Sequence, residues 1–210
     1  MTYKRNQIED AAESLFRQWE RPTAGLRTRL KRLLEMDGEK LREDGPSKRA
    51  RRQSLAFRSV ESPGTGAEIW FSEYEALALL LGLMLLDHGW PQGAVANILR
   101  EARGKLEPEH ARILRKLRAA NRGPVQKPST GGPAARPDGV FFCISSPNRS
   151  TSTREGTNAF AIYRSEAEMM KALLSKIQSF TIYELIALTR SLSTELSRSE
   201  PRKRGRRGGT

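Results

Sequence analysis

The feature of this sequence that most constrains its fold is an uncharged apolar run, ALALLLGLMLL, at residues 76–86. A run this short cannot cross a bilayer, which takes about 20 apolar residues, so it predicts a helix buried on nearly all sides. Ser72 and Glu75 have the spacing of a capping box at the start of that helix. Gly89 suits the left-handed position after a helix, and Pro91 suits the first turn of the next one. The run therefore predicts a buried helix that ends in a tight turn.

A second helix is predicted directly after this turn, at residues 92–103. It repeats apolar residues at Val95, Ile98 and Leu99, with polar residues between them. Residues 72–103 thus combine a buried helix, a glycine-centred turn and an amphipathic helix. This order is the sequence shape of a helix-turn-helix, in which the second helix packs on the first and presents its other face to DNA.

Two resemblances point the same way. Residues 80–99 resemble helix-turn-helix families, which commonly have a glycine at the place of Gly89 and an apolar residue at the place of Trp90. Residues 70–112, with HGWPQ near their centre, are similar to a set of uncharacterised bacterial proteins with a MerR-like helix-turn-helix segment. The resemblance implies a bacterial, regulator-like protein and carries over no assigned activity.

Under this interpretation the outer face of the second helix offers four side chains to DNA. The amides of Gln92 and Asn97 can read adenine. Arg100 suits guanine or phosphate, and Arg103 suits phosphate. An ordinary helical hairpin with a glycine cap would have the same pattern, and the sequence leaves that alternative open.

The net charge of +13 favours a polyanionic partner, with nucleic acid first. The excess lies at the two ends: residues 1–57 hold 14 Lys and Arg against 9 Asp and Glu, and residues 197–210 hold 6 against 1. Two basic runs in these ends are predicted to act as arms that add non-specific affinity for double-stranded DNA. These arms contain Arg49, Arg51 and Arg52 in the first run, and Arg202, Lys203 and Arg204 in the second.

The N-terminal part predicts two more helices. Residues 6–20 have one apolar helical face, and Arg21-Pro22 ends that helix. Thr23 is predicted to cap the second helix. That helix has an apolar stripe (Leu26, Leu30, Leu33, Leu34) and an opposite basic face (Arg27, Arg29, Lys31, Arg32). The basic face either contacts phosphates or base edges, or is the solvated face of a helical hairpin, and both interpretations stay open.

The predicted fold class is α+β and mainly α, with a helical core, a small antiparallel sheet and disordered basic tails. The sheet is assigned to residues 67–71, 140–145 and 159–163, and a short strand is also expected at Ala56-Phe57. Further helices are expected at residues 108–120, 166–178 and 181–196, with an interruption at Gly104. The predicted domain boundaries are a helical hairpin (1–37), a basic linker (38–54), an α+β core (55–196) with a Gly/Pro linker (123–139), and a basic tail (197–210).

The sequence offers little catalytic chemistry. Two histidines, His88 and His110, and one cysteine, Cys143, do not make a four-ligand zinc site, and C-x-x-C, H-E-x-x-H and glycine-rich nucleotide loops are absent from the sequence. We therefore expect no enzymatic activity, no metal and no cofactor. The single cysteine favours a reducing compartment, and no segment resembles a signal peptide or a membrane span, so we expect a cytoplasmic protein.

Together these features predict a non-enzymatic DNA-binding protein, a bacterial transcriptional regulator that docks through residues 72–103. One alternative is a protein-interaction module in which the helix at 181–196 mediates assembly, for example as a homodimer. Another is an RNA- or ribosome-associated basic protein, although VFFCIS at residues 140–145 lacks the basic and glycine positions of an RNA-recognition strand.

Overall fold

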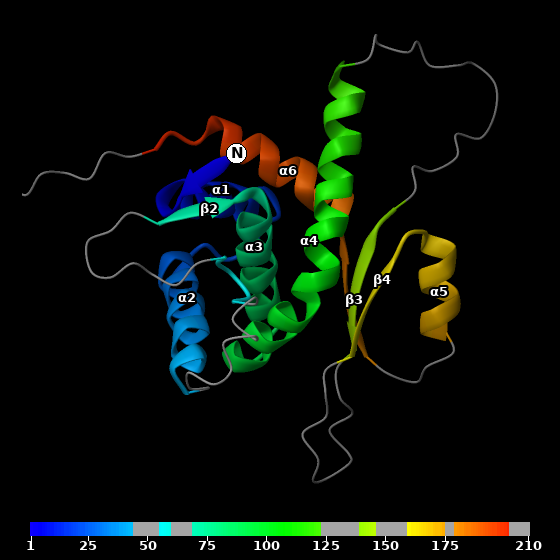
Figure 1. The fold of residues 1–210 in the computed structure, drawn as a ribbon, viewed down its shortest axis with the longest axis horizontal. Helices are drawn as coiled ribbons and strands as arrows, with labels where there is room; N and C mark the ends of the chain where they lie inside the picture. Colours follow the sequence, from blue (N-terminus) through cyan, green and yellow to red (C-terminus); the bar gives the residue numbers. More distant parts are fainter. Residues whose placement is uncertain (44–54, 60–68, 123–138, 146–158, 175–178, 202–210) are drawn as a thin grey trace, which may run out of the picture. The chain divides into compact units, whose positions relative to one another are not determined.

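The computed structural model describes residues 1–43, 55–59, 69–122, 139–145, 159–174 and 179–201 (Figure 1). The chain divides into two compact units, residues 1–100 with 191–210 (unit 1) and residues 101–190 (unit 2). Its helices and short antiparallel sheets confirm the predicted α+β, mainly α fold class. Among the described helices, none combines the length and the apolar character needed to cross a membrane.

Unit 1 is built around helix α3, and its elements come from distant parts of the sequence. Strand β1 pairs antiparallel with β2, which places Tyr3 opposite Phe71. The strand predicted at residues 67–71 therefore exists as β2, but its partner is β1 and not the other predicted strands. Strand β1 has no sequence signal of its own, because three residues are too few for a recognisable alternation. The elements are β1 (Thr2–Lys4), α1 (Arg5–Gln18), α2 (Leu26–Glu43), β2 (Trp70–Ser72), α3 (Glu73–Asp87) and the start of α4 (Gln92–Arg122).

Helix α3 confirms the central prediction. Every residue from Tyr74 to Leu85 is buried. The capping box is formed, because Ser72 Oγ accepts a hydrogen bond from the Glu75 N–H at 3.2 Å and Glu75 Oε2 accepts one from the Ser72 N–H at 2.6 Å. Gly89 has the left-handed φ of +81° that the turn was expected to need. This helix is the core against which the rest of unit 1 packs.

Helix α4 is longer than predicted. The expected interruption at Gly104 and restart at Pro108 are wrong, because one helix runs from Gln92 to Arg122 with Pro108 inside it. A proline removes the hydrogen bond to the carbonyl four residues earlier, here that of Gly104. Gly104 and Pro108 are both exposed, so water can bond the freed carbonyl and the helix continues.

Unit 2 contains a three-stranded antiparallel sheet with β3 in the middle. The predicted pairing of residues 140–145 with 159–163 is confirmed, with Cys143 opposite Ala161. The third strand, however, comes from residues that were expected to begin the helix at 181–196. That helix begins later, because Glu184 caps it by accepting hydrogen bonds from the N–H groups of Ile186 (2.9 Å) and Ala187 (2.6 Å). The β-branched and aromatic residues before Glu184 form the strand. The elements are β3 (Phe141–Ser145), β4 (Ala159–Tyr163), α5 (Glu166–Leu174), β5 (Phe180–Glu184) and α6 (Leu185–Arg198).

One smaller expectation also needs correction. Ala56-Phe57 does not form a strand but lies in a buried coil segment. The helix predicted at residues 166–178 is present as α5 up to Leu174, and positions 175–178 lie outside the described residues. The apolar face of α6, which suggested an assembly surface, is used inside the chain: Leu185, Leu188, Leu192 and Leu196 are all buried.

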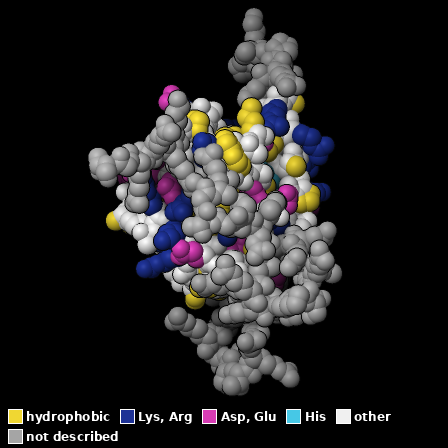
Figure 2. Space-filling model, turned by 60° about the vertical axis from the view of Figure 1, so that its left-hand side comes forward, with side chains coloured by type: hydrophobic (Ala, Val, Ile, Leu, Met, Phe, Trp, Pro, Cys, Tyr) yellow, Lys and Arg dark blue, Asp and Glu magenta, His cyan; other side chains and the backbone are white. Residues whose placement is uncertain are grey.

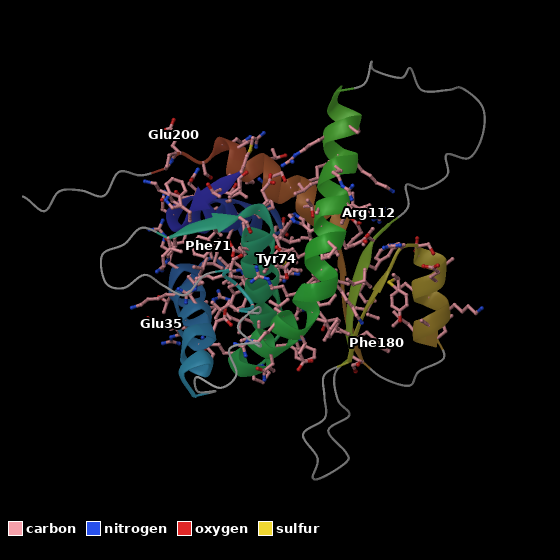
Figure 3. The ribbon with its side chains drawn as sticks, viewed as in Figure 1. Glu35, Phe71, Tyr74, Arg112, Phe180 and Glu200 are labelled. Atoms are coloured by element: carbon pink, nitrogen blue, oxygen red, sulfur yellow. The ribbon has the colours of Figure 1, made fainter. Side chains whose placement is uncertain are left out.

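The end of α6 is held against α1 in unit 1. Ser14 Oγ on α1 donates to Glu195 Oε2 at 2.7 Å, and Gln7 Nε2 donates to the backbone carbonyl of Ser199 at 2.7 Å. Asn6 Nδ2 donates to the carbonyl of Glu200 at 3.3 Å, the residue marked beyond α6 in Figure 3. The two amides of α1 thus hold the two residues that follow α6 against α1.

The contact between α1 and α6 predicts a pH-dependent stability. Hydrogen bonds from Ser14, opposed by burial and supported by Gln18 and Arg198, hold the pKa of Glu195 below its usual 4.5. A carboxyl whose pKa is lowered by folding stabilises the fold above its unfolded pKa, and this stability is lost as the pH falls through the folded pKa. Glu195→Gln should therefore lower the Tm at neutral pH, and its gap to wild type should close as the pH falls below about 4.

Thermal unfolding followed by circular dichroism measures this gap at each pH. In a Ser14→Ala background, which lacks the principal donor, the gap should be smaller. A gap of equal size at neutral and at acidic pH would contradict the prediction.

Candidate nucleic-acid interface

Helices α1 and α2 form a compact pair joined by residues 19–25. The predicted cap at Thr23 is wrong, because α2 begins at Leu26, and Gly25 with φ of +73° precedes it. The carbonyl of Gly25 accepts the first helical hydrogen bond, from the Arg29 N–H at 2.8 Å. The apolar stripe of α2 is buried as predicted, at Leu26, Leu30, Leu33 and Leu34. This burial fixes which side of α2 faces outward.

The outward side of α2 is polar and mainly basic. Its exposed residues recur at successive intervals of one and three positions, which is the spacing of a single helical face. They are Arg27, Thr28, Lys31, Arg32 and Glu35. Glu35 points away from the helix in Figure 3, and Figure 2 shows lysine and arginine side chains beside carboxylates on the left-hand part of the face that it presents.

The cations of this face are weakly held. Arg27 Nη2 lies 3.4 Å from Asp10 Oδ1 and 3.7 Å from Glu13 Oε2, and its side chain is 55% exposed. Lys31 Nζ lies 3.5 Å from Glu35 Oε1 with 60% of its side chain exposed. Exposed pairs of this kind contribute about 0–1 kcal/mol, so these cations can exchange a carboxylate for a phosphate at little cost.

The other two cations of the predicted basic face, Arg29 and Arg32, differ from each other. Arg32 is exposed and makes no hydrogen bond or ion pair with the residues that the structure describes. Arg29, which the sequence placed on the same basic face, instead holds the turn between the helices. Its Nη2 donates to the carbonyls of Pro22 (3.3 Å) and Ala24 (3.0 Å), and its Nη1 lies 3.8 Å from Asp87 Oδ1.

The start of α4, which was predicted to present its polar side chains to DNA, exposes them less than α2 does. Gln92 and Asn97 are half-buried. Arg100 Nη2 donates to Asp37 Oδ1 at 2.7 Å, and its side chain is 21% exposed while that of Asp37 is fully buried. The expectation that Arg100 faces outward is therefore wrong, because the buried carboxylate requires a cation.

Asp37 could have been recognised from the sequence. It lies three residues after Leu34 and four after Leu33, on the apolar stripe of α2, where a carboxylate is buried and must find partners. Besides Arg100, it accepts hydrogen bonds from the backbone N–H groups of Ala56 (3.0 Å) and Phe57 (3.1 Å). We call Asp37, Arg100 and these two N–H groups the Asp37 clamp.

Arg103 is also not a free phosphate ligand. The residue is 6% exposed, and its Nε lies 3.1 Å from Glu107 Oε2, one helical turn later on α4. The expectation that Arg103 lies on the outer face is wrong, since most of its side chain is packed in the protein. Both predicted arms, with Arg49, Arg51 and Arg52 and with Arg202, Lys203 and Arg204, lie outside the described residues.

The described residues offer no metal site, since none of their His, Cys, Asp and Glu side chains gather in a group of three or more suited to an ion. Burial raises the pKa of the Cys143 thiol to about 11, so this cysteine stays protonated at neutral pH and is a poor nucleophile. His110 is buried in α4. The basic face of α2 is thus the feature of unit 1 with the clearest potential for binding.

Comparison with protein families and with curated proteins finds no family and no curated sequence that matches this chain.

Proposed function

We propose that this chain binds double-stranded DNA through the exposed face of α2, the surface of Arg27, Thr28, Lys31 and Arg32. The observation that carries this proposal is the separation of the two sides of α2. Leu26, Leu30, Leu33 and Leu34 are buried, while Arg27, Lys31 and Arg32 lie in solvent with weak partners or none among the described residues. A helix with this division can lie in a major groove about 12 Å wide.

The chemistry of the face suits a duplex. Arginines contact guanine and phosphate, and a threonine hydroxyl can bond either base edges or phosphate. Duplex DNA is a better partner than duplex RNA, because the major groove of A-form RNA is too deep and narrow for side chains to read. The proposal keeps the predicted class of function and moves the contact from α4 to α2, since Arg100 and Arg103 are held inside the fold.

A salt titration tests the proposal. For the variant Arg27→Gln/Lys31→Gln/Arg32→Gln, we expect the affinity for a labelled duplex of roughly 20 bp, two helical turns, to fall. The loss at about 0.1 M salt should be roughly 100-fold, and the slope of log Kobs against log salt should become shallower by about 3. Fluorescence anisotropy measures both quantities.

A charge-matched control removes three exposed or half-exposed cations elsewhere: Arg5→Gln/Lys171→Gln/Arg198→Gln. It tests whether net charge alone drives binding. The proposal fails if the α2 variant and this control bind the duplex equally well. A further variant, Gln92→Ala/Asn97→Ala, should bind like wild type, and a loss there would return the contact to α4.

A further inference from the structure

The C-terminal end of α4 in unit 2 is a second cationic surface, and it differs from α2 in having almost no compensating charge. Among the residues of α4 whose side chains are described, Leu114 is the last buried one, Leu117 is half-buried, and the other residues at positions 115–120 are exposed. Within unit 2 these last turns extend beyond the sheet (Figure 1). Packing thus decreases towards the end of the helix.

The exposed residues of this end are cations and alanines. Arg115, Lys116 and Arg118 are exposed, as are Ala119 and Ala120. Arg115 and Lys116 make no hydrogen bond or ion pair with the described residues. The sequence from position 110 to position 137 contains seven Lys and Arg and no Asp or Glu, so the chain supplies no nearby carboxylate in sequence.

The helix also places like charges next to one another. Arg112 is followed by Arg115 and Lys116 at three and four positions, and Arg115 by Arg118 at three, which are the spacings at which like charges on a helix repel. Glu109 neutralises Arg112, to which it is hydrogen-bonded. Arg115 and Lys116 have no such carboxylate among the described residues, and a bound polyanion would relieve the repulsion between them and their neighbours.

Stabilisation of the helix dipole does not account for all of these cations. That effect is confined to the last turn of a helix. Arg115 and Lys116 lie seven and six residues before the end of α4 at Arg122, which is nearly two turns away. A different use for these two side chains is therefore needed.

We infer that the end of α4, at Arg115, Lys116 and Arg118, is a second contact for the phosphate backbone of duplex DNA, independent of base sequence. The inference rests on the proposed function and extends it. Positions 111–120 contain neither Ser, Thr, Asn nor Gln, so the side chains that can bind DNA here are Arg and Lys, and phosphate is the group that all of them bind. Contacts to phosphate supply affinity and not specificity.

The test compares four proteins on two duplexes of unrelated sequence, each over a range of salt concentrations. They are wild type, the α4 variant Arg115→Gln/Lys116→Gln/Arg118→Gln, the α2 variant and the charge-matched control. For the α4 variant we expect a loss of affinity of roughly tenfold to 100-fold at about 0.1 M salt, the same on both duplexes. Its salt slope should be shallower by about 2 to 3.

Two further measurements separate DNA contact from a structural role. The α4 variant should unfold at the same temperature as wild type or higher, because the exchange removes repulsion and no packing. The charge-conserving variant Arg115→Lys/Arg118→Lys should bind like wild type. A lower Tm with unchanged salt slope would overturn the inference.

The outcomes distinguish the two proposals. If the α4 variant binds like the control while the α2 variant loses affinity, the inference is overturned and the proposed function stands. If only the α4 variant loses affinity, the contact on α4 stands and the proposal for α2 fails. If wild type binds neither duplex, both fail.

Discussion

Replacing Asp37 with alanine is expected to lower the free energy of unfolding of unit 1 by about 3–5 kcal/mol, the loss typical of a broken buried ion pair. Asp37 is fully buried, and its carboxylate is shared by Arg100 and by the N–H groups of Ala56 and Phe57, two residues that are themselves fully buried. Without Asp37 each N–H group is left without its acceptor, at a cost of about 1–3 kcal/mol. Since whole domains are stable by about 5–15 kcal/mol, this loss is a large share.

Urea unfolding followed by tryptophan fluorescence measures the loss in unit 1 alone. All three tryptophans, Trp19, Trp70 and Trp90, belong to that unit. The matched control is Asp10→Ala, which removes a partly exposed carboxylate 3.4 Å from Arg27 and should cost less than about 1 kcal/mol. Equal midpoints for the two variants would show that the Asp37 clamp does not stabilise the fold.

A double-mutant cycle measures the interaction between Asp37 and Arg100 in the Asp37 clamp. Removing Arg100 after Asp37 should cost much less than removing Arg100 from wild type, because the two side chains stabilise each other. Additive losses would contradict the pairing. The cycle also separates the stabilising role of Arg100 from DNA binding, since it measures unfolding in the absence of any ligand.

Truncation of Phe57 to alanine should lower the free energy of unfolding by about 3–5 kcal/mol, the usual cost of removing a buried phenylalanine ring. Phe57 is 0% exposed although it lies in a coil segment. Its ring fills the space left by Gly82 on α3, where an added Cβ would lie 3.1 Å from Phe57 Cε1 and 3.0 Å from Leu33 Cδ1. Residues 55–58 are thus part of the core.

The control for this prediction is Trp70→Ala, which truncates an aromatic residue that is 50% exposed. Unfolding of both variants is followed by circular dichroism. Gly82→Ala should be better tolerated in the Phe57→Ala background than in wild type, because the missing ring leaves room for the methyl group. If Phe57→Ala destabilises no more than Trp70→Ala, the ring is not a core element.

The sequence by itself determined the elements whose signals are local. The uncharged run at residues 76–86 predicted the buried α3, the spacing of four leucines predicted the buried side of α2, and two apolar segments predicted the pairing of β3 with β4. Periodicity works here because burial of one helical face or one strand depends on the residue types within that element.

The tertiary structure alone decided the pairing of β1 with β2, the assignment of residues 180–184 to a strand and the direction of Arg100. Each depends on a partner far away in the sequence: β1 on β2, β5 on β3, and Arg100 on Asp37, 63 residues earlier. In a helical-wheel projection, the polar residue Arg100 lies beside the apolar side of α4. It does not show which element lies opposite, and the buried carboxylate there determined where the long side chain goes.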